Sequence, residues 1–339
     1  MRVPAPSFAH LEGMSTADGL FEHAEFAMPR TEHGFCVDDV ARGLVVTARE
    51  PSPTDMVRRL SATYLAFTVD AIAPDGSAHN RRQDRGDWTD APGTGDHWGR
   101  ALWGLGTAAA SSVDEDMRER ALAGARRMLQ ARSTHPRAMA HASVGAREVL
   151  RAAPGDSRAL ALLRDARTVI GRPAMDPRWP WPQPRLGYAN ALLPEAMMVI
   201  GEGLDDERAF ADGIALLAWL VEQETRGTHL SVTPTGGRGP GDVVPGYDQQ
   251  PIEVSSLAEA SARALAHTGD ARWAYVLDRC SAWFLGWNDV GLALYDPATG
   301  GGHDGLLRDA VNLNQGAEST LSAIATFQLA RAALLVPVS

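Results

Sequence analysis

Carboxylate, amide, histidine and aromatic side chains recur at one kind of place in this 339-residue sequence, the starts of Ala-, Leu- and Gly-rich segments with helical periodicity. Planar polar groups of these types bind sugar hydroxyls, and aromatic rings stack on the apolar faces of pyranose rings. Glycosidic cleavage uses two carboxyl groups, one protonated as the acid and one ionised as the base or nucleophile. The pattern therefore favours sugar chemistry.

Five acidic residues at these helix starts are candidates for the catalytic pair: Asp38, Asp39, Asp96, Glu253 and Glu318. Asp38 and Asp39 are adjacent and point in different directions on a helix, so at most one is expected to be catalytic. Glu253 and Glu318 lie in first turns of otherwise buried helices, where a carboxylate is costly without a purpose. We expect Asp39 to act with Glu253 or Glu318, with Asp96 as the main competitor. Acidic residues at helix starts also serve as caps, and that alternative stays open for each Asp.

A second set of polar and aromatic residues lies at the same helix starts or in the loops before them. We expect Trp88, Trp98, Trp181 and Tyr247 to stack on sugar rings and the polar members to bind hydroxyl groups. The expected substrate-binding residues are His33, Trp88, His97, Trp98, Arg100, Trp181, Tyr188, Asn190, Tyr247, Asp248, Gln249, Gln250, His303, Asp304, Asn314 and Gln315.

Other chemistries lack their sequence motifs. The chain has no HExxH spacing, no GxGxxG after a strand, no GxxxxGK[ST] and no GxSxG. We therefore expect no metal and no cofactor. The net charge of −10 and the complete absence of Lys disfavour nucleic-acid and anionic membrane partners, so the expected partner is a saccharide substrate.

Apolar runs and cysteine spacing indicate the cellular compartment and the state of the cysteines. No apolar run marks a signal peptide at MRVPAPSFAH, and no window approaches 18 uninterrupted apolar residues. Cys36 and Cys280 form no CxxC spacing and are expected to be buried thiols. We expect a cytoplasmic protein, whose oligomeric state the sequence does not indicate.

Two alternating kinds of helix would position the polar residues. Helices rich in small residues, suited to close packing in an inner ring, are expected at residues 38–49, 96–110, 139–152, 190–201, 253–267 and 315–334. Charged amphipathic helices, suited to an outer ring, are expected at 55–72, 114–132, 157–170, 205–222 and 271–285, with 15–25 as the sixth. The pattern predicts an all-α (α/α)6 toroid, a single domain over 1–339. Loops 74–95, 172–187, 226–251 and 288–314 would cluster where the inner helices begin.

Four blocks carry a resemblance to a known family: EHGFCVDDVARGL, DHWGRALWGLG, YDQQPIEVSSLAEA and GGHDGLLRDAVNLNQGAESTLS. The first resembles the pattern GYCTDDNARAL. The family's helical region is similar to six-hairpin (α/α)6 glycosidase-like domains and can follow a nucleotide-sugar transferase domain, so its members are often labelled glycosyltransferases. The resemblance spans roughly residues 21–330. The residues that match the family's blocks are Asp38, Asp39, Arg42, Asp96, Arg100, Gln250, Glu253, Asp304, Gln315 and Glu318.

The resemblance is partial. Gln183 and Ala189 stand where relatives often have acidic residues, so no catalytic role is implied at these two positions. This sequence contains no transferase domain, so a nucleotide-sugar donor is not implied either.

Together, the residues and the resemblance predict a glycoside hydrolase of the inverting type acting on an oligosaccharide or glycoconjugate. Inversion is an analogy with other (α/α)6 glycosidases. One alternative is a sugar epimerase or isomerase, which needs a histidine pair such as His97 and His303 as a proton shuttle. Another is a non-catalytic carbohydrate-binding module, which would bind saccharides without turnover.

Overall fold

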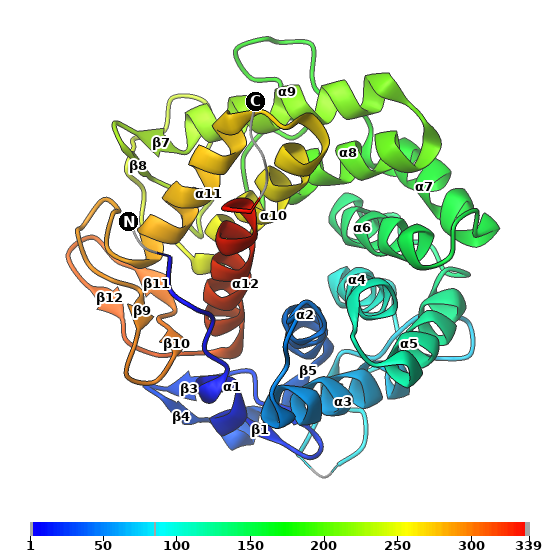
Figure 1. The fold of residues 1–339 in the computed structure, drawn as a ribbon. Coiled ribbons are helices and arrows are strands. Elements are labelled where there is room, and N and C mark those ends of the chain that lie inside the picture. Colours follow the sequence, from blue (N-terminus) through cyan, green and yellow to red (C-terminus); the bar gives the residue numbers. More distant parts are fainter. Residues whose placement is uncertain (1–2, 85, 336–339) are drawn as a thin grey trace.

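Twelve α-helices form within residues 3–84 and 86–335, the part of the chain that this computed structural model describes, and they are arranged as a ring (Figure 1). The inner helices are α2 (Val37–Ala48), α4 (Asp96–Ser111), α6 (Pro136–Ala152), α8 (Leu192–Leu204), α10 (Pro251–Thr268) and α12 (Ala317–Ala333). The outer helices are α1 (Ala9–Gly13), α3 (Asp55–Asp70), α5 (Glu115–Met128), α7 (Ser157–Ile170), α9 (Glu207–Gln223) and α11 (Ala271–Phe284). Each inner helix packs against the next, and α12 packs against α2, which closes the ring. The predicted (α/α)6 toroid is confirmed.

The sixth outer helix differs from the prediction. Residues 15–25 form short strands instead of a helix, and the five-residue α1 takes the outer position against α12. The reason is local: Asp18 donates its backbone N–H to the Thr16 hydroxyl, and Gly19 pairs with Thr16 in a tight antiparallel hairpin. A two-residue loop, Ala17 and Asp18, thus joins the two short strands, and this hairpin prevails over helical periodicity.

Outer and inner helices begin differently. Helices α3, α5, α7, α9 and α11 each start with a side chain that accepts a hydrogen bond from a free backbone N–H of the first turn; these N-caps are Thr54, Asp114, Asp156, Asp206 and Asp270. None of the six inner helices has a side-chain N-cap among the described residues. The carboxylates at the inner-helix starts are therefore not the caps of these helices, and the first-turn N–H groups add positive potential at that end of the ring.

Glycine lets two inner helices approach very closely. A Cβ atom at Gly106 of α4 would lie 2.4 Å from the carbonyl oxygen of Gly145 on α6, and a Cβ at Gly145 would lie 2.5 Å from the carbonyl carbon of Leu102. The two backbones are therefore in direct contact, which only glycine permits. Close packing of this kind brings the inner-helix starts together around a narrow mouth.

Short strands organise the loops at that mouth. They form antiparallel pairs: β1 (Ser15–Thr16) with β2 (Gly19–Leu20), β3 (Ala24–Glu25) with β4 (Met28–Pro29), β5 (Phe35–Cys36) with β6 (Arg81–Arg82), β7 (Thr225–Arg226) with β8 (His229–Leu230), β9 (Tyr295–Asp296) with β10 (Gly301–Gly302), and β11 (Gly305–Leu306) with β12 (Val311–Asn312). A bridge between Gln249 and Leu306 joins the loop before α10 to the loop before α12. Within the described ranges, no helix is both long enough and apolar enough to cross a bilayer.

Candidate active site

A polar cavity of about 330 Å³ opens where the inner helices begin. This volume is within the range of small-molecule sites. Eight of the residues expected at the site line it: Asp38, Asp39, Arg100, Tyr188, Asp248, Gln250, Asp304 and Glu318. We call it the mouth cavity. It gathers side chains from the starts of α2, α4, α10 and α12 and from the loop before α8, so residues more than 270 positions apart in sequence share one wall.

Arg42 and Tyr188 form the centre of the cavity floor. Arg42 Nη1 donates to Asp39 Oδ1 at 2.6 Å, and Nη2 lies 2.7 Å from Glu318 Oε2. The Tyr188 hydroxyl accepts from Arg42 and Arg100 and donates to Glu318 Oε2 at 2.6 Å. Burial raises the pKa of Tyr188, which keeps its hydroxyl protonated as a donor. One guanidinium thus bridges two candidate carboxylates and fixes their relative position.

Asp38 and Asp39 are adjacent in sequence but lie in different electrostatic environments. Asp38 pairs with Arg100 and accepts from the Asn80 amide at 3.1 Å. Burial disfavours its charge, but Arg100 and Arg42 outweigh burial and lower its pKa. Asp39 is 3% exposed, and burial raises its pKa to about 6 although Arg42 acts in the opposite direction. Asp38 is therefore a fixed anion, whereas Asp39 titrates near neutral pH.

The pH dependence of stability tests this difference. The folded pKa of Asp39, about 6, lies above its unfolded value, so the stabilisation from its proton is full at low pH and is lost as pH rises through about 6. We expect Asp39→Asn to remove that loss. The unfolding free energy of the wild type relative to the variant should fall by up to about 3 kcal/mol between about pH 4 and about pH 7 in urea titrations. Parallel pH profiles for the two proteins would contradict a protonated Asp39.

Asp248 and Asp304 both line another part of the wall, and the charge of Asp304 acts on Asp248. Burial, and then the charge of Asp304, raise the pKa of Asp248. Burial also raises the pKa of Asp304, although the Gly316 N–H donates to its Oδ1 at 2.8 Å and favours the ionised form. Neither carboxylate has an arginine partner among the described residues.

Two of the five expected catalytic residues do not line the cavity. Glu253 is 4% exposed, and its two oxygens accept from the backbone N–H groups of Ala189 and Asn190 and from the Asn190 amide. Ala189 has a positive φ of 45°, so Glu253 holds a strained loop in place beneath Tyr188. Asp96 is half-buried and also lies outside the cavity lining. Both are better placed to support the site than to react in it.

The four residues expected to stack on sugar rings do not line the mouth cavity. Trp98 and Trp181 are 0% and 1% exposed and belong to the core, so this structure leaves no face of either ring for a sugar. Trp88 stacks on His79 at 5.3 Å and donates to Asp70. Tyr247 lies under the Arg308 guanidinium at 5.4 Å. Trp98 and Trp181 are thus core residues, whereas Trp88 and Tyr247 remain half-buried.

The remaining expected binding residues support the loops instead of lining the cavity. Gln249 donates to Asp289 at 2.8 Å, Gln315 donates to Asp296 at 3.1 Å, and His97 lies 3.0 Å from the Ala78 carbonyl. The others in this group are His33, exposed beside His23; Asn190, which accepts from Gly187; Asn314, which accepts from Phe26; and His303, whose Nδ1 has no partner among the described atoms.

Sequence reasoning missed several lining residues, chiefly Glu22, His23 and Cys36. Ligand atoms of Glu22, Cys36 and Asp39 lie within 4.8 Å of one another, close enough to hold a metal ion. Each is already partnered: Cys36 donates to Asp39, Glu22 pairs with Arg81, and Asp39 pairs with Arg42. Burial also raises the pKa of the Cys36 thiol, which disfavours the thiolate that a metal requires. This cluster does not suggest a metal centre.

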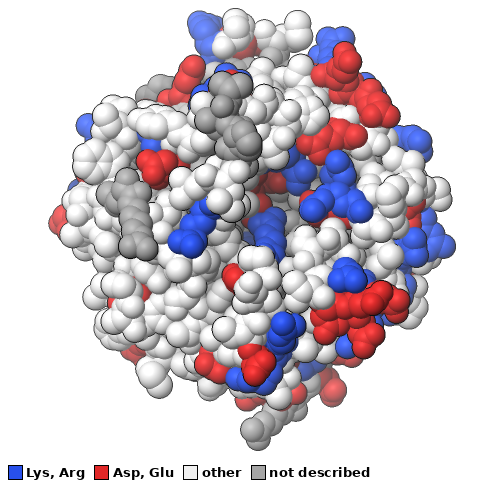
Figure 2. All heavy atoms as spheres, in the orientation of Figure 1, with Lys and Arg blue, Asp and Glu red and all other residues white. Residues whose placement is uncertain are grey.

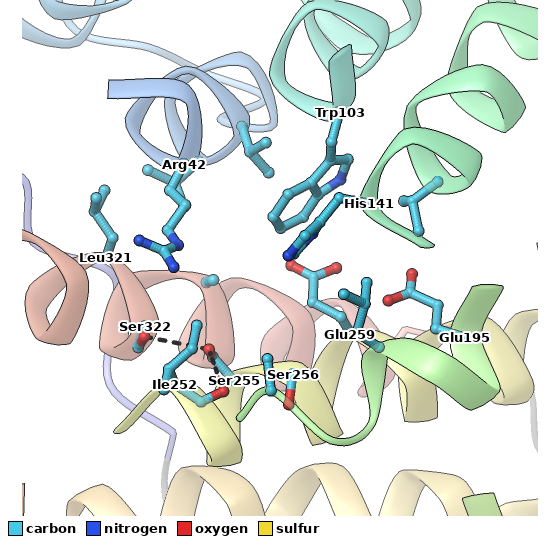
Figure 3. A pocket seen from close by; sticks show the side chains of 16 residues that line it. Arg42, Trp103, His141, Glu195, Ile252, Ser255, Ser256, Glu259, Leu321 and Ser322 are labelled. Atoms are coloured by element: carbon cyan, nitrogen blue, oxygen red, sulfur yellow. Dashed lines mark hydrogen bonds between the residues drawn. The ribbon is translucent and has the colours of Figure 1, made fainter. Parts of the chain in front are cut away.

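Arg42 also separates the mouth cavity from a small cavity on the ring axis, of about 40 Å³ (Figure 3). Figure 3 shows Arg42 at one end of this axial cavity and the carboxylates of Glu195 and Glu259 toward the other. His141, stacked on Trp103 at 6.1 Å, has no hydrogen-bond partner on either ring nitrogen among the described atoms. The space suits one or two water molecules. The mouth cavity therefore ends at Arg42 as a pocket and does not continue as a wide channel.

A third cavity, of about 860 Å³, lies at the opposite mouth, where the inner helices end. Arginine and acidic side chains line it, and on the face shown in Figure 2 both kinds gather around the central hollow. Arg49 binds Glu259 through two bonds of 2.5 and 2.9 Å. Arg263 contacts Glu148, Glu195 and Glu202 within 3.4 Å. We call this group the far-end charge network; its charges are paired with one another, unlike those of Asp248 and Asp304.

No family model and no curated protein matches the chain. Solved structures match along almost its whole length. A cellobiose 2-epimerase from Bacillus thermoamylovorans B4167 has a TM-score of 0.70 at 9% identity, with 96% of each chain covered. A sugar epimerase from a ruminal bacterium has a TM-score of 0.69 at 11% identity, covering 96% of this chain and 95% of that one. The cellulase Cel9M of C. cellulolyticium, solved with cellobiose, has a TM-score of 0.64 at 9% identity, covering 92% and 87%. The likeness is one of fold, the (α/α)6 toroid; the resemblance to proteins fused to glycosyltransferases has no matching family model.

Proposed function

We propose that this chain is a carbohydrate-active enzyme and, more specifically, a glycoside hydrolase of the inverting type. One observation carries the proposal: the inner-helix starts meet in a closed-ended cavity in which Arg42 and Tyr188 orient Glu318, while Asp248 and Asp304 have no arginine partner among the described residues. Glycosidic hydrolysis needs one carboxylate that accepts a proton and one carboxyl group that donates it. The names of the solved structures with this fold, sugar epimerases and a cellulase, support saccharide chemistry.

Glu318 is the best-placed base. Its side chain is 31% exposed, and Arg42 and Tyr188 both hold Oε2. Oε1 has no hydrogen-bond partner within the described part of the chain, so it is free to accept a proton from water. Asp39 acts beside it by fixing Arg42 through Oδ1. In this mechanism Glu318 removes a proton as the water oxygen attacks the anomeric carbon from the face opposite the leaving group.

The epimerase alternative has weaker support from the geometry. A two-histidine shuttle needs both rings at the substrate, and neither His97 nor His303 lines the mouth cavity. His23 is the histidine in the described lining. The binding-module alternative predicts open aromatic platforms, whereas Trp98 and Trp181 are buried.

An oligosaccharide panel tests the proposal. The chain should release new reducing ends from at least one di- or oligosaccharide, and proton NMR of the first product should show the anomer opposite to that of the substrate. Epimerisation would change the sugar without new reducing ends. Saccharide binding without any product, measured by calorimetry on the same panel, would support the binding module and contradict the hydrolase.

A further inference from the structure

The Asp248 carboxyl group differs from the other acidic groups of the mouth cavity. Oδ1 of Asp248 is buried and has no hydrogen-bond partner among the described atoms. By contrast, Asp38 pairs with Arg100, and Asp39 and Glu318 both pair with Arg42. An ionised oxygen buried without a donor is costly, whereas a protonated carboxyl group is tolerated there and can donate.

Asp304 explains why the proton belongs on Asp248. Two carboxyl groups whose charges interact in one partly buried cavity do not ionise independently. Asp304 accepts from the Gly316 N–H at the start of α12 and from the Ser319 hydroxyl, and both bonds stabilise its charge. Asp248 accepts from no such donor in the described part of the chain, and burial together with the Asp304 charge raises its pKa. The donors to Asp304 and the unpartnered Oδ1 of Asp248 therefore favour the proton on Asp248.

The backbone fixes the position of this carboxyl group. Gln249, the next residue, exchanges two backbone hydrogen bonds with Leu306 of β11, at 3.1 and 2.8 Å. The Asp248 carboxyl group packs directly on Gly305: a Cβ atom there would lie only 2.2 Å from Oδ1. Glycine at position 305 therefore leaves the space that the Asp248 carboxyl group occupies, and the side chain of any larger residue would fill that space.

We propose that Asp248 is the proton donor to the leaving group and that Gly305 is the positioning residue that seats it; the proposal rests on the hydrolase function proposed above. Asp248 transfers its carboxyl proton to the glycosidic oxygen as the bond from that oxygen to the anomeric carbon breaks. Glu318 takes a proton from the attacking water, whose oxygen forms the new bond to the anomeric carbon. After product release, solvent returns a proton to Asp248 and takes one from Glu318, so the cycle balances.

Leaving-group dependence tests the donor role. A dinitrophenyl leaving group departs without protonation, whereas a sugar leaving group needs a proton. We expect Asp248→Asn to lower kcat/KM by about 10²–10⁴-fold on an unactivated disaccharide and by less than about 10-fold on the matching dinitrophenyl glycoside. Equal losses on both substrates, or no loss on the disaccharide, would overturn the assignment.

The variant Gly305→Ala tests whether Gly305 positions the Asp248 carboxyl group. The added methyl group displaces the Asp248 carboxyl group, so this variant should reproduce the same substrate selectivity with a smaller loss of kcat and little change in KM. Gly236→Ala is the matched control, because a Cβ at Gly236 meets nothing within 4 Å. If Gly305→Ala behaves like Gly236→Ala on both substrates, Gly305 has no positioning role.

A measurement without substrate separates this inference from the proposed function. In ¹³C-carboxyl NMR of Asp-labelled protein, with Asp248→Asn giving the assignment, Asp248 should titrate above the ordinary Asp pKa, and Asp304→Asn should shift its titration down. An Asp248 that titrates at the ordinary value of about 3.9 overturns the donor role even if the wild type cleaves saccharides. If the pKa of Asp248 is elevated but the protein cleaves no saccharide, the proposed hydrolase function is contradicted, whereas the protonated state of Asp248 is retained.

Discussion

Replacing Glu318 with glutamine is expected to lower kcat/KM on saccharide substrates by about 10³-fold, within the range for loss of a general base. The amide keeps an oxygen that can accept from Tyr188 and Arg42, which hold Oε2 at 2.6 and 2.7 Å in the wild type. It cannot take up a proton from the attacking water. Unlike Asp248→Asn, this change should affect disaccharides and dinitrophenyl glycosides equally, since both need an activated water. Initial rates on the two substrates measure the effect.

Two controls distinguish a missing base from a disturbed fold. Glu25→Gln removes an exposed carboxylate of β3 near the mouth, outside the cavity lining, and should leave the rate unchanged. Glu253→Gln disrupts the bonds to Ala189 and Asn190 and should lower thermal stability together with activity. The assignment of Glu318 would be wrong if its glutamine variant kept most of its activity while a fully folded Glu253→Gln variant had none.

The ring was predictable because its signal is periodic and repeated. Each inner helix needs small residues on both sides, and Gly106 and Gly145 show how strictly the structure uses them. Only the sixth outer helix was wrong, where the turn at Ala17 and Asp18 prevails over the local pattern. A turn of two residues carries less weight in a sequence than a longer helical pattern, but it decides the backbone where it occurs.

The sequence predicted which acidic residues would lie together at the site, but not the role of each one. Asp39, Asp248, Asp304 and Glu318 meet as the clustering of helix starts implies. The sequence does not show which of them an arginine neutralises, because Arg42 reaches Glu318 from 276 positions away in the chain. It also does not show that Glu253 faces the Ala189 loop instead of the cavity. Distances of a few ångströms between distant segments decide charge and protonation, and periodicity contains no information on them.

The burial of Trp98 and Trp181 was also not predictable from the sequence. Trp98 donates to the Gly76 carbonyl at 3.0 Å from within the core, and Trp181 stacks near Trp219 at 6.2 Å. Both lie within a few residues of the mouth along the chain, so sequence position alone favoured sugar stacking. For Trp98, which lies on α4, helix rotation sets which face the residue occupies, since one position along a helix turns a side chain by about 100°.

Replacing Arg263 with methionine is expected to cost about 3–5 kcal/mol of unfolding free energy at about pH 8, the penalty for breaking a buried ion pair from one side. Arg263 contacts Glu148, Glu195 and Glu202, whose side chains are at most 10% exposed. Methionine fills similar space but leaves three buried carboxylates with less compensation. Urea titration of the variant measures the loss, and activity per folded molecule should be retained because the far-end charge network lies at the mouth opposite the candidate site.

The loss should shrink as the pH falls, and this dependence identifies its cause. Burial raises the pKa of Glu195 to about 7 with Arg263 present, and removing the cation raises it further. A raised folded pKa contributes stability at low pH that is lost as pH rises, so at about pH 5 the variant should recover much of the difference as Glu195 takes up a proton. Arg272→Met breaks an exposed pair with Asp270 and should cost less than about 1 kcal/mol at either pH. A cost for Arg263→Met that is equally small, or that does not change with pH, would mean that the network is solvated and does not hold the far end of the ring together.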